Sequence, residues 1–107
     1  MGQPQPIDPN NDNRETIETY NPATGKVHKK YQLQNEDEAN RVIDACHEAY
    51  LSWRETSMDE RAKIIRKIGE LLRENKDELA KMMAEQMGKP LKQGETEVEL
   101  CAGICDY

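Results

Sequence analysis

The chain has 107 residues, of which 36% are hydrophobic and 34% are charged, and it contains no Phe. Its 15 Lys and Arg residues against 21 Asp and Glu residues give a net charge of -6, unlike the basic surfaces that bind nucleic acids or anionic membranes. No apolar run could cross a bilayer and the first ten residues lack a signal-peptide pattern, so we expect a cytoplasmic protein without nucleic-acid or membrane partners.

Residues 1–14 contain three prolines among Asn, Gln and Asp residues and show no apolar periodicity. A segment of this composition cannot bury enough apolar surface to offset the entropy of ordering. We predict a disordered lead-in over 1–14 and a single structured unit over 15–107.

A β-hairpin is predicted next. Residues 16–20 and 26–33 alternate apolar and polar side chains and are rich in β-branched and aromatic types. Between them lies NPATG, in which Pro22 fixes φ and Gly25 can supply a left-handed position. A two-stranded hairpin is marginally stable alone, so it must pack on another part of the protein.

The rest of the chain predicts about four amphipathic helices. Asn35 with Glu38 and Ser57 with Glu60 have capping-box spacing, while Asn75 marks a new start or a bend. A last helix follows Pro90 and its apolar pattern is still running at Tyr107. The stripes of the first two helices comprise Ala39, Val42, Ile43, Cys46, Tyr50 and Trp53, followed by Ile64, Ile65, Ile68, Leu71 and Leu72.

Three cysteines, Cys46, Cys101 and Cys105, occur without a secretory signal, which favours reduced thiols over disulfides. Their spacing matches no zinc template, even if His28 or His47 is added, and we expect all three to be buried in the core. Cys46 precedes His47, but neighbouring residues on a helix point about 100° apart, so the two do not form a nucleophile and base.

Catalytic and coenzyme-binding patterns are also missing. The sequence contains neither GxGxxG nor GxxxxGK[ST], and Pro90 removes an N–H that a phosphate loop after Gly88 would use. Glu95, Glu97 and Glu99 are more typical of a solvated helix face than of paired catalytic carboxylates. We therefore expect no catalytic, cofactor-binding or divalent-metal residue here, and the residues by themselves indicate a scaffold or interaction segment.

Three stretches in order resemble the N-terminal part of the aldehyde dehydrogenase superfamily: TYNPATGKVH, then residues 49–99 with their WR, ERA, GKP and EV motifs, then LCAGICDY. The match covers residues 16–107. The EQMGKPLKQGETEVELC stretch is most similar to the succinate-semialdehyde dehydrogenase branch.

This resemblance implies that the hairpin and helices belong to an α/β Rossmann-like coenzyme-binding domain. It also implies that the chain is an N-terminal fragment, truncated at Tyr107 and inactive alone, of a homo-oligomeric enzyme. The remainder of the polypeptide would be its partner and would supply the nucleotide-binding sheet, the catalytic Cys and the general-base Glu. Such a parent oxidises an aldehyde, here suggested to be succinate semialdehyde, to the carboxylic acid with NAD or NADP. In this reaction a thiolate adds to the carbonyl, hydride passes to the nicotinamide, and water hydrolyses the thioester.

The resemblance also implies two sets of candidate site residues. Thr19 and Tyr20, through their backbone, and Gln86, through its side chain, match the positions at which some family members bind a monovalent cation, although Gln86 is neutral where the family has an acidic side chain. Glu97, Leu100 and Cys101 match the helix that borders the substrate tunnel. For both sets, ordinary turn, capping and helix-packing roles are the preferred interpretation.

A function from a different class stays open. The chain has the composition of a free-standing, non-catalytic helical interaction module that shares this ancestry without the chemistry. A stand-alone domain should cap its last helix and cover its apolar stripes, and Asp106 and Tyr107 provide no such cap. The sequence therefore favours the enzyme fragment.

Overall fold

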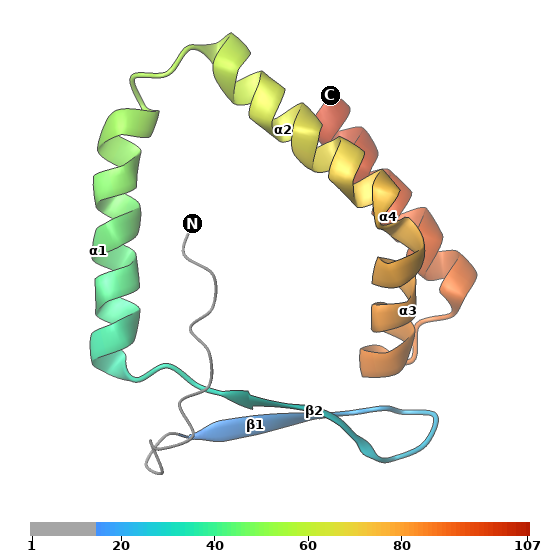
Figure 1. Cartoon of the computed structure of the whole chain (residues 1–107). Helices are drawn as coiled ribbons and strands as arrows, with labels where there is room; N and C mark the ends of the chain where they lie inside the picture. The colour runs from blue at the N-terminus through green and yellow to red at the C-terminus, as the bar shows by residue number, and fades with distance from the viewer. Residues whose placement is uncertain (1–14) are drawn as a thin grey trace.

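The computed structural model describes residues 15–107, so the predicted lead-in over 1–14 lies outside the described residues. Two strands, β1 (Thr16–Tyr20) and β2 (Val27–Gln32), precede four helices. The helices are α1 (Glu36–Trp53), α2 (Met58–Glu74), α3 (Lys76–Met87) and α4 (Leu91–Asp106). The predicted hairpin followed by four helices is confirmed (Figure 1).

The hairpin forms as the alternating pattern predicts. β1 and β2 pair antiparallel with Ile17 opposite Tyr31, and the register shifts between Thr19 and Tyr20. In the connecting turn, the Ala23 N–H donates to the Asn21 side-chain oxygen at 2.9 Å. Gly25 has φ of 69°, a left-handed conformation that is costly for residues with a Cβ. The sequence NPATG therefore fixes this turn.

Capping boxes begin the first two helices. Asn35 accepts from the Glu38 N–H at 2.9 Å, and the Glu38 carboxylate accepts from the Asn35 N–H. Ser57 and Glu60 make the same reciprocal pair at the start of α2. These bonds satisfy N–H groups that have no partner within the helix, so both predicted starts are confirmed.

The line of α2 and α3 is interrupted at Asn75, where φ is -103° and ψ is 14°. The Asn75 side chain donates to the Leu71 carbonyl at 2.8 Å, so it closes α2 and does not cap α3. α3 ends at Gly88, whose φ of 75° is left-handed. Pro90 then cannot continue the helix, and α4 begins at Leu91.

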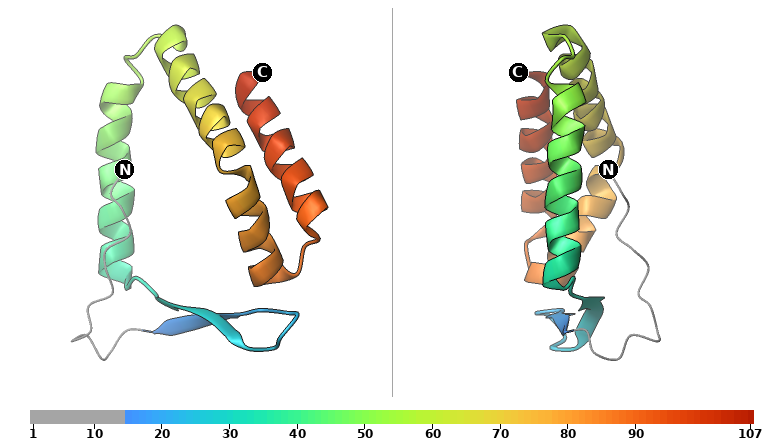
Figure 2. Two further views of the ribbon diagram at one scale, coloured as in Figure 1. Left: turned by 45° about the vertical axis from the view of Figure 1, so that its right-hand side comes forward. Right: turned by 90° about the vertical axis from the view of Figure 1, so that its left-hand side faces the viewer.

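α4 runs back alongside α2 and α3, antiparallel to both (Figures 1 and 2). α4 approaches α2 and α3 most closely at two glycines, Gly69 and Gly94. A Cβ on Gly69 of α2 would lie 3.0 Å from the Cys105 Cβ, and one on Gly94 of α4 would lie 3.1 Å from Ala80. The apolar side chains buried among the described residues are those of Ala80, Val98 and Ala102. Small residues, more than large apolar ones, thus hold this helical layer together.

The described residues form a flat, open frame measuring 47 × 40 × 15 Å. The hairpin crosses one end, α1 forms one side, and α2 to α4 form the other (Figure 2). The radius of gyration is 17.7 Å, whereas a compact domain of this length has roughly 13 Å. α1 has no buried residue.

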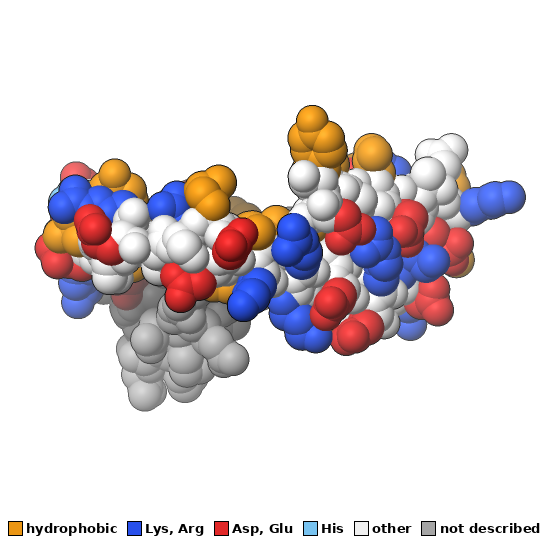
Figure 3. Space-filling view, turned by 90° about the horizontal axis from the view of Figure 1, so that it is seen from above, with side chains coloured by type: hydrophobic (Ala, Val, Ile, Leu, Met, Phe, Trp, Pro, Cys, Tyr) orange, Lys and Arg blue, Asp and Glu red, His pale blue; other side chains and the backbone are white. Residues whose placement is uncertain are grey.

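The expectation that all three thiols are buried in the core is wrong for the described residues, and the apolar stripes of α1 and α2 are also largely exposed. Ile43 is 64% exposed and Ile64 is 48% exposed, while Cys46 and Cys101 are exposed and Cys105 is half-buried. The reason is that α4 covers only one side of α2 and α3, and no described element packs over α1. Viewed from above, acidic and basic side chains are interspersed and apolar ones project along an edge (Figure 3).

Candidate functional site

The cation candidates on β1 have side chains engaged within the hairpin. Thr19 Oγ1 donates to the Lys29 carbonyl at 3.3 Å. The Tyr20 hydroxyl donates to the Glu18 carboxylate at 3.0 Å, and this hydrogen bond, together with the negative charge of Glu18, raises the pKa of Tyr20. These hydrogen bonds engage the two side chains, whereas the resemblance places cation binding at the backbone of Thr19 and Tyr20, so they do not test the candidate site.

The third cation candidate, Gln86, is half-buried near the end of α3, and α3 packs against β1. A Cβ on Gly88 would lie 3.3 Å from Pro22 Cγ, so the turn after β1 and the end of α3 touch. His28 Nε2 also lies 4.0 Å from a Glu85 carboxylate oxygen. The structure thus brings together the two elements that carry the candidates, while cation binding by Thr19, Tyr20 and Gln86 stays a prediction.

The tunnel candidates on α4 do not surround one cavity. Glu97 is half-buried and its carboxylate pairs with the Lys89 ammonium group. Leu100 is 64% exposed and lines an open hollow of about 570 Å³ between α4 and the start of α3. Cys101 is exposed, and neither it nor Glu97 lines that hollow. Their role in a substrate tunnel stays a prediction.

Arg73 connects α2 to α4 through two carboxylates. Its Nε donates to Glu99 at 2.8 Å and its Nη2 to Asp106 at 2.7 Å. The hydrogen bond from Arg73 lowers the pKa of Asp106, and both carboxylates raise the pKa of Arg73. No local pattern pointed to this cluster, because Glu99 and Asp106 lie 26 and 33 residues from Arg73 in the sequence. It fixes how α4 sits on α2.

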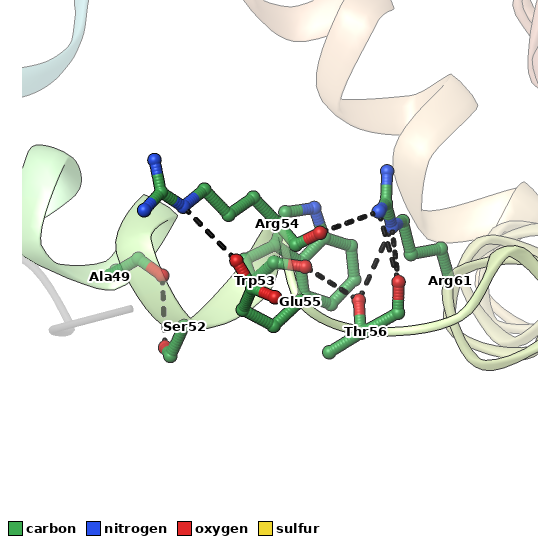
Figure 4. Close-up of polar contacts among 7 residues, drawn as sticks. All are labelled: Ala49, Ser52, Trp53, Arg54, Glu55, Thr56 and Arg61. Atoms are coloured by element: carbon green, nitrogen blue, oxygen red, sulfur yellow. Dashed lines mark hydrogen bonds and ion pairs between the residues drawn. The ribbon is translucent and has the colours of Figure 1, made fainter.

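Arg61 holds the corner between α1 and α2 (Figure 4). Its guanidinium donates to the carbonyls of Arg54 and Thr56 and to the Thr56 hydroxyl. Arg61 belongs to the ERA motif of the sequence resemblance, but sequence reasoning assigned it no contact. The sequence signal that could have found it is a basic residue in the first turn of a helix, where the helix dipole disfavours a positive charge, so that the side chain needs partners outside that helix.

A hollow of about 240 Å³ lies between the first half of α2 and the end of α4, and Cys105 is among its lining residues. Residues 15–107 contain no group of three or more His, Cys, Asp or Glu side chains able to hold a metal ion. No helix in the described part of the chain is long and apolar enough to span a membrane. Gly69 and Gly94 are packed against neighbouring helices, and Gly25 lies at the tip of the hairpin, so these glycines do not form a phosphate-binding turn.

The sequence profile of the aldehyde dehydrogenase family matches residues 9–107. The chain is 36% identical, over 89% of its length, to succinate-semialdehyde dehydrogenase [NADP(+)] 2 of Schizosaccharomyces pombe. It is 36% identical, over 81% of its length, to succinate semialdehyde dehydrogenase [NAD(P)+] Sad of Escherichia coli. It is 34% identical, over 91% of its length, to D-glyceraldehyde dehydrogenase (NADP(+)) of Thermoplasma acidophilum. In each case the chain spans about a fifth of the relative, 19% of its length.

Proposed function

This chain belongs to the aldehyde dehydrogenase family, and we propose that it is the N-terminal scaffold segment of an NAD(P)-dependent enzyme that oxidises an aldehyde to a carboxylic acid. In this role the hairpin and helices pack at the edge of a Rossmann-like coenzyme-binding domain. The remainder of the polypeptide is their partner, and the assembled enzyme is a homo-oligomer. The relatives support the proposal, since the chain corresponds to about a fifth of each.

The observation that carries the proposal is the exposed apolar face of the frame. Large side chains of α1 and α2 that belong to regular stripes remain about half exposed, among them Ile43, Tyr50, Ile64 and Ile68. Fully burying one such side chain contributes about 1.5–3 kcal/mol, so covering both stripes would add substantially to stability. A segment that leaves these faces open is suited to pack onto a larger core.

For the substrate, we propose a semialdehyde, with succinate semialdehyde as the first to test. Four relatives at 36–37% identity carry names that specify succinate semialdehyde, and two at 34–35% specify glutarate semialdehyde. Both are short aldehydes with a terminal carboxylate, so a cationic group in the substrate pocket of the whole enzyme would recognise them.

The described residues do not fit NAD or NADP as a binding site. A dinucleotide needs a glycine-rich turn at a helix N-terminus to accept its phosphates. Here Gly88 is followed by Lys89 and Pro90, and the Lys89 ammonium group is already paired with Glu97. We therefore propose that this segment supports the coenzyme domain without contacting the coenzyme.

A chimeric enzyme tests the proposal. The matching segment of the S. pombe relative would be replaced by residues 15–107 of this chain, and NADP reduction would be followed with succinate semialdehyde. We expect a soluble, active oligomer, while the 107 residues alone should not reduce NADP. A folded chimera without activity, or turnover by the 107 residues alone, would contradict the scaffold role.

Two matched variants sharpen the chimera experiment. Ile43→Glu places a charge on the exposed apolar stripe of α1 and should abolish assembly, because the carboxylate would be buried without a partner. Asp44→Glu, one position further along the same helix, should leave activity unchanged. Equal behaviour of the two variants would show that this face of α1 is not covered.

The alternative is a non-catalytic helical interaction module, supported by the same exposed stripes. It predicts that a separate protein covers the apolar faces and that the chimera fails to assemble even though the 107 residues are folded. The chimera experiment therefore distinguishes the two functions.

A further inference from the structure

The connector between α1 and α2 comprises only residues 54–57. Connectors of about 2–5 residues are typical of antiparallel helical hairpins, in which two helices fold against each other. Both helices also carry exposed apolar stripes, which the hydrophobic effect would drive together. Yet α1 and α2 diverge from the corner, and α1 contains no buried residue (Figure 1). The contacts made at the corner therefore bear on how far apart α1 and α2 stand.

Arg61 supplies four side-chain hydrogen bonds at this corner. Its Nη2 donates to the Thr56 carbonyl at 2.9 Å and to the Arg54 carbonyl at 3.1 Å. Its Nε donates to Thr56 Oγ1 at 3.2 Å and to the Thr56 carbonyl at 3.3 Å. Two nitrogens of one planar guanidinium, Nε and Nη2, thus bind two residues of the connector, Arg54 and Thr56, from the first turn of α2 (Figure 4).

Thr56 links Arg61 to the end of α1 through hydrogen bonds. Its hydroxyl donates to the Trp53 carbonyl at 2.6 Å while it accepts from Arg61, so its single proton and a lone pair are both used. Trp53 is the last residue of α1, and the last turn of that helix holds no basic residue. Arg61 therefore also places a positive charge near the negative end of the α1 dipole.

We propose that Arg61 is a brace that fixes the angle between α1 and α2 and prevents the two helices from closing into a helical hairpin. Closing would require the connector to turn, which would break the bonds from Arg61 to Arg54 and Thr56. The brace keeps the apolar faces of α1 and α2 apart and available. This geometry is a property of the corner and does not depend on the enzymatic role of the chain.

The test is a distance measurement in the 107-residue chain. Cys46, Cys101 and Cys105 would be changed to Ser, and spin labels attached at Asn40→Cys in α1 and Glu74→Cys in α2, two exposed positions far from the corner. With Arg61 present, we expect one narrow distribution at long distance. Arg61→Ala should add a broad population at shorter distances, whereas Thr56→Val, which removes only the hydroxyl, should have a smaller effect of the same sign.

Lys63→Ala is the matched control, because Lys63 is exposed on the same helix and its side chain forms no hydrogen bond or ion pair with any residue from 15 to 107. Circular dichroism would verify that the helices persist. If Arg61→Ala lowers helix content, the test uses Arg61→Lys, which retains the charge but loses the planar guanidinium. This variant should also add a population at shorter distances. Two results would overturn the proposal. One is the same distance distribution for the parent chain, Arg61→Lys and Thr56→Val. The other is a parent chain in which the two spin labels are already at short distance.

Discussion

Arg73 of α2 donates a 2.7 Å hydrogen bond to the carboxylate of Asp106, at the far end of α4. Glu99, nearly two turns earlier on α4, accepts from the same guanidinium at 2.8 Å. One cation thus joins two points of α4 to one point of α2. Because Gly69 lies close to Cys105 in the same seam, the ion pairs and the close helix contact fix the same helix register.

The first prediction concerns pH. The hydrogen bond from Arg73 keeps the pKa of Asp106 below its usual 3.8. A carboxylate whose pKa is lowered on folding stabilises the folded state above its unfolded pKa, and this stabilisation is lost as pH falls through the folded pKa. We expect Asp106→Asn to destabilise the α2–α4 seam at neutral pH, with a difference from the parent chain that disappears in acid. Urea unfolding followed by circular dichroism across this range measures it; a difference independent of pH would contradict the ionic origin.

The second prediction concerns the glycine in the seam. Gly69→Ala would place a Cβ 3.0 Å from the Cys105 Cβ and 3.2 Å from the Ala102 carbonyl. Overpacking of this kind costs about 1–3 kcal/mol, more than the roughly 1 kcal/mol that Ala gains over Gly in a helix. Gly103→Ala is the control, since nothing lies within 4 Å of its Cβ position. Urea unfolding should show Gly69→Ala destabilised and Gly103→Ala stabilised; the same sign for both would rule out this packing.

The third prediction concerns the start of α2. Ser57→Ala removes the side-chain acceptor of the Glu60 N–H, and loss of an N-cap costs about 1 kcal/mol. Ser52→Ala, in the last turn of α1, removes only a hydroxyl that donates to the Ala49 carbonyl (Figure 4). The midpoint of thermal unfolding should fall clearly for Ser57→Ala and hardly change for Ser52→Ala. If the two variants melt alike, the capping box is not formed in solution.

The fourth prediction concerns the thiols. Cys46 and Cys101 are exposed, whereas Cys105 is half-buried against α2. In single-cysteine forms of the 107-residue chain, Cys46 and Cys101 should react with a disulfide reagent such as DTNB at similar, fast rates, and Cys105 more slowly. The absorbance change gives the reaction rates. In urea, where the chain is unfolded, the rates of the three cysteines should become equal. Slow reaction of Cys46 in the folded chain would mean that the apolar face of α1 is covered, for example by a second copy.

Local structure was predictable because its causes lie within a few residues. The capping boxes at Asn35 and Ser57 use partners three positions away, and the NPATG turn contains both its Pro and its left-handed Gly. Capping and turn geometry depend on such short spacings, and their observed positions agree with those predicted. The family resemblance was also carried by short motifs, and the family profile confirmed it.

Burial was not predictable in the same way. An apolar stripe indicates that a helix face can be covered, but it does not specify the covering element, so Cys46 was expected in a core and is exposed. The contacts that hold the frame are long-range in sequence or formed by residues with no distinctive local signature. Arg73 meets Asp106 across 33 residues, and Arg61 was one of several basic residues in α2.

The sequence alone therefore determined the hairpin, the helix starts and the family, because each depends on local spacing, turn chemistry or motif order. Only the tertiary structure decided that α4 packs on α2 and α3 through Gly69 and Gly94, that Arg73 joins α2 to α4, and that Arg61 braces a corner which leaves α1 standing apart. The physical reason is that periodicity fixes which face of a helix is apolar, whereas steric fit and hydrogen bonds between distant residues fix what that face meets.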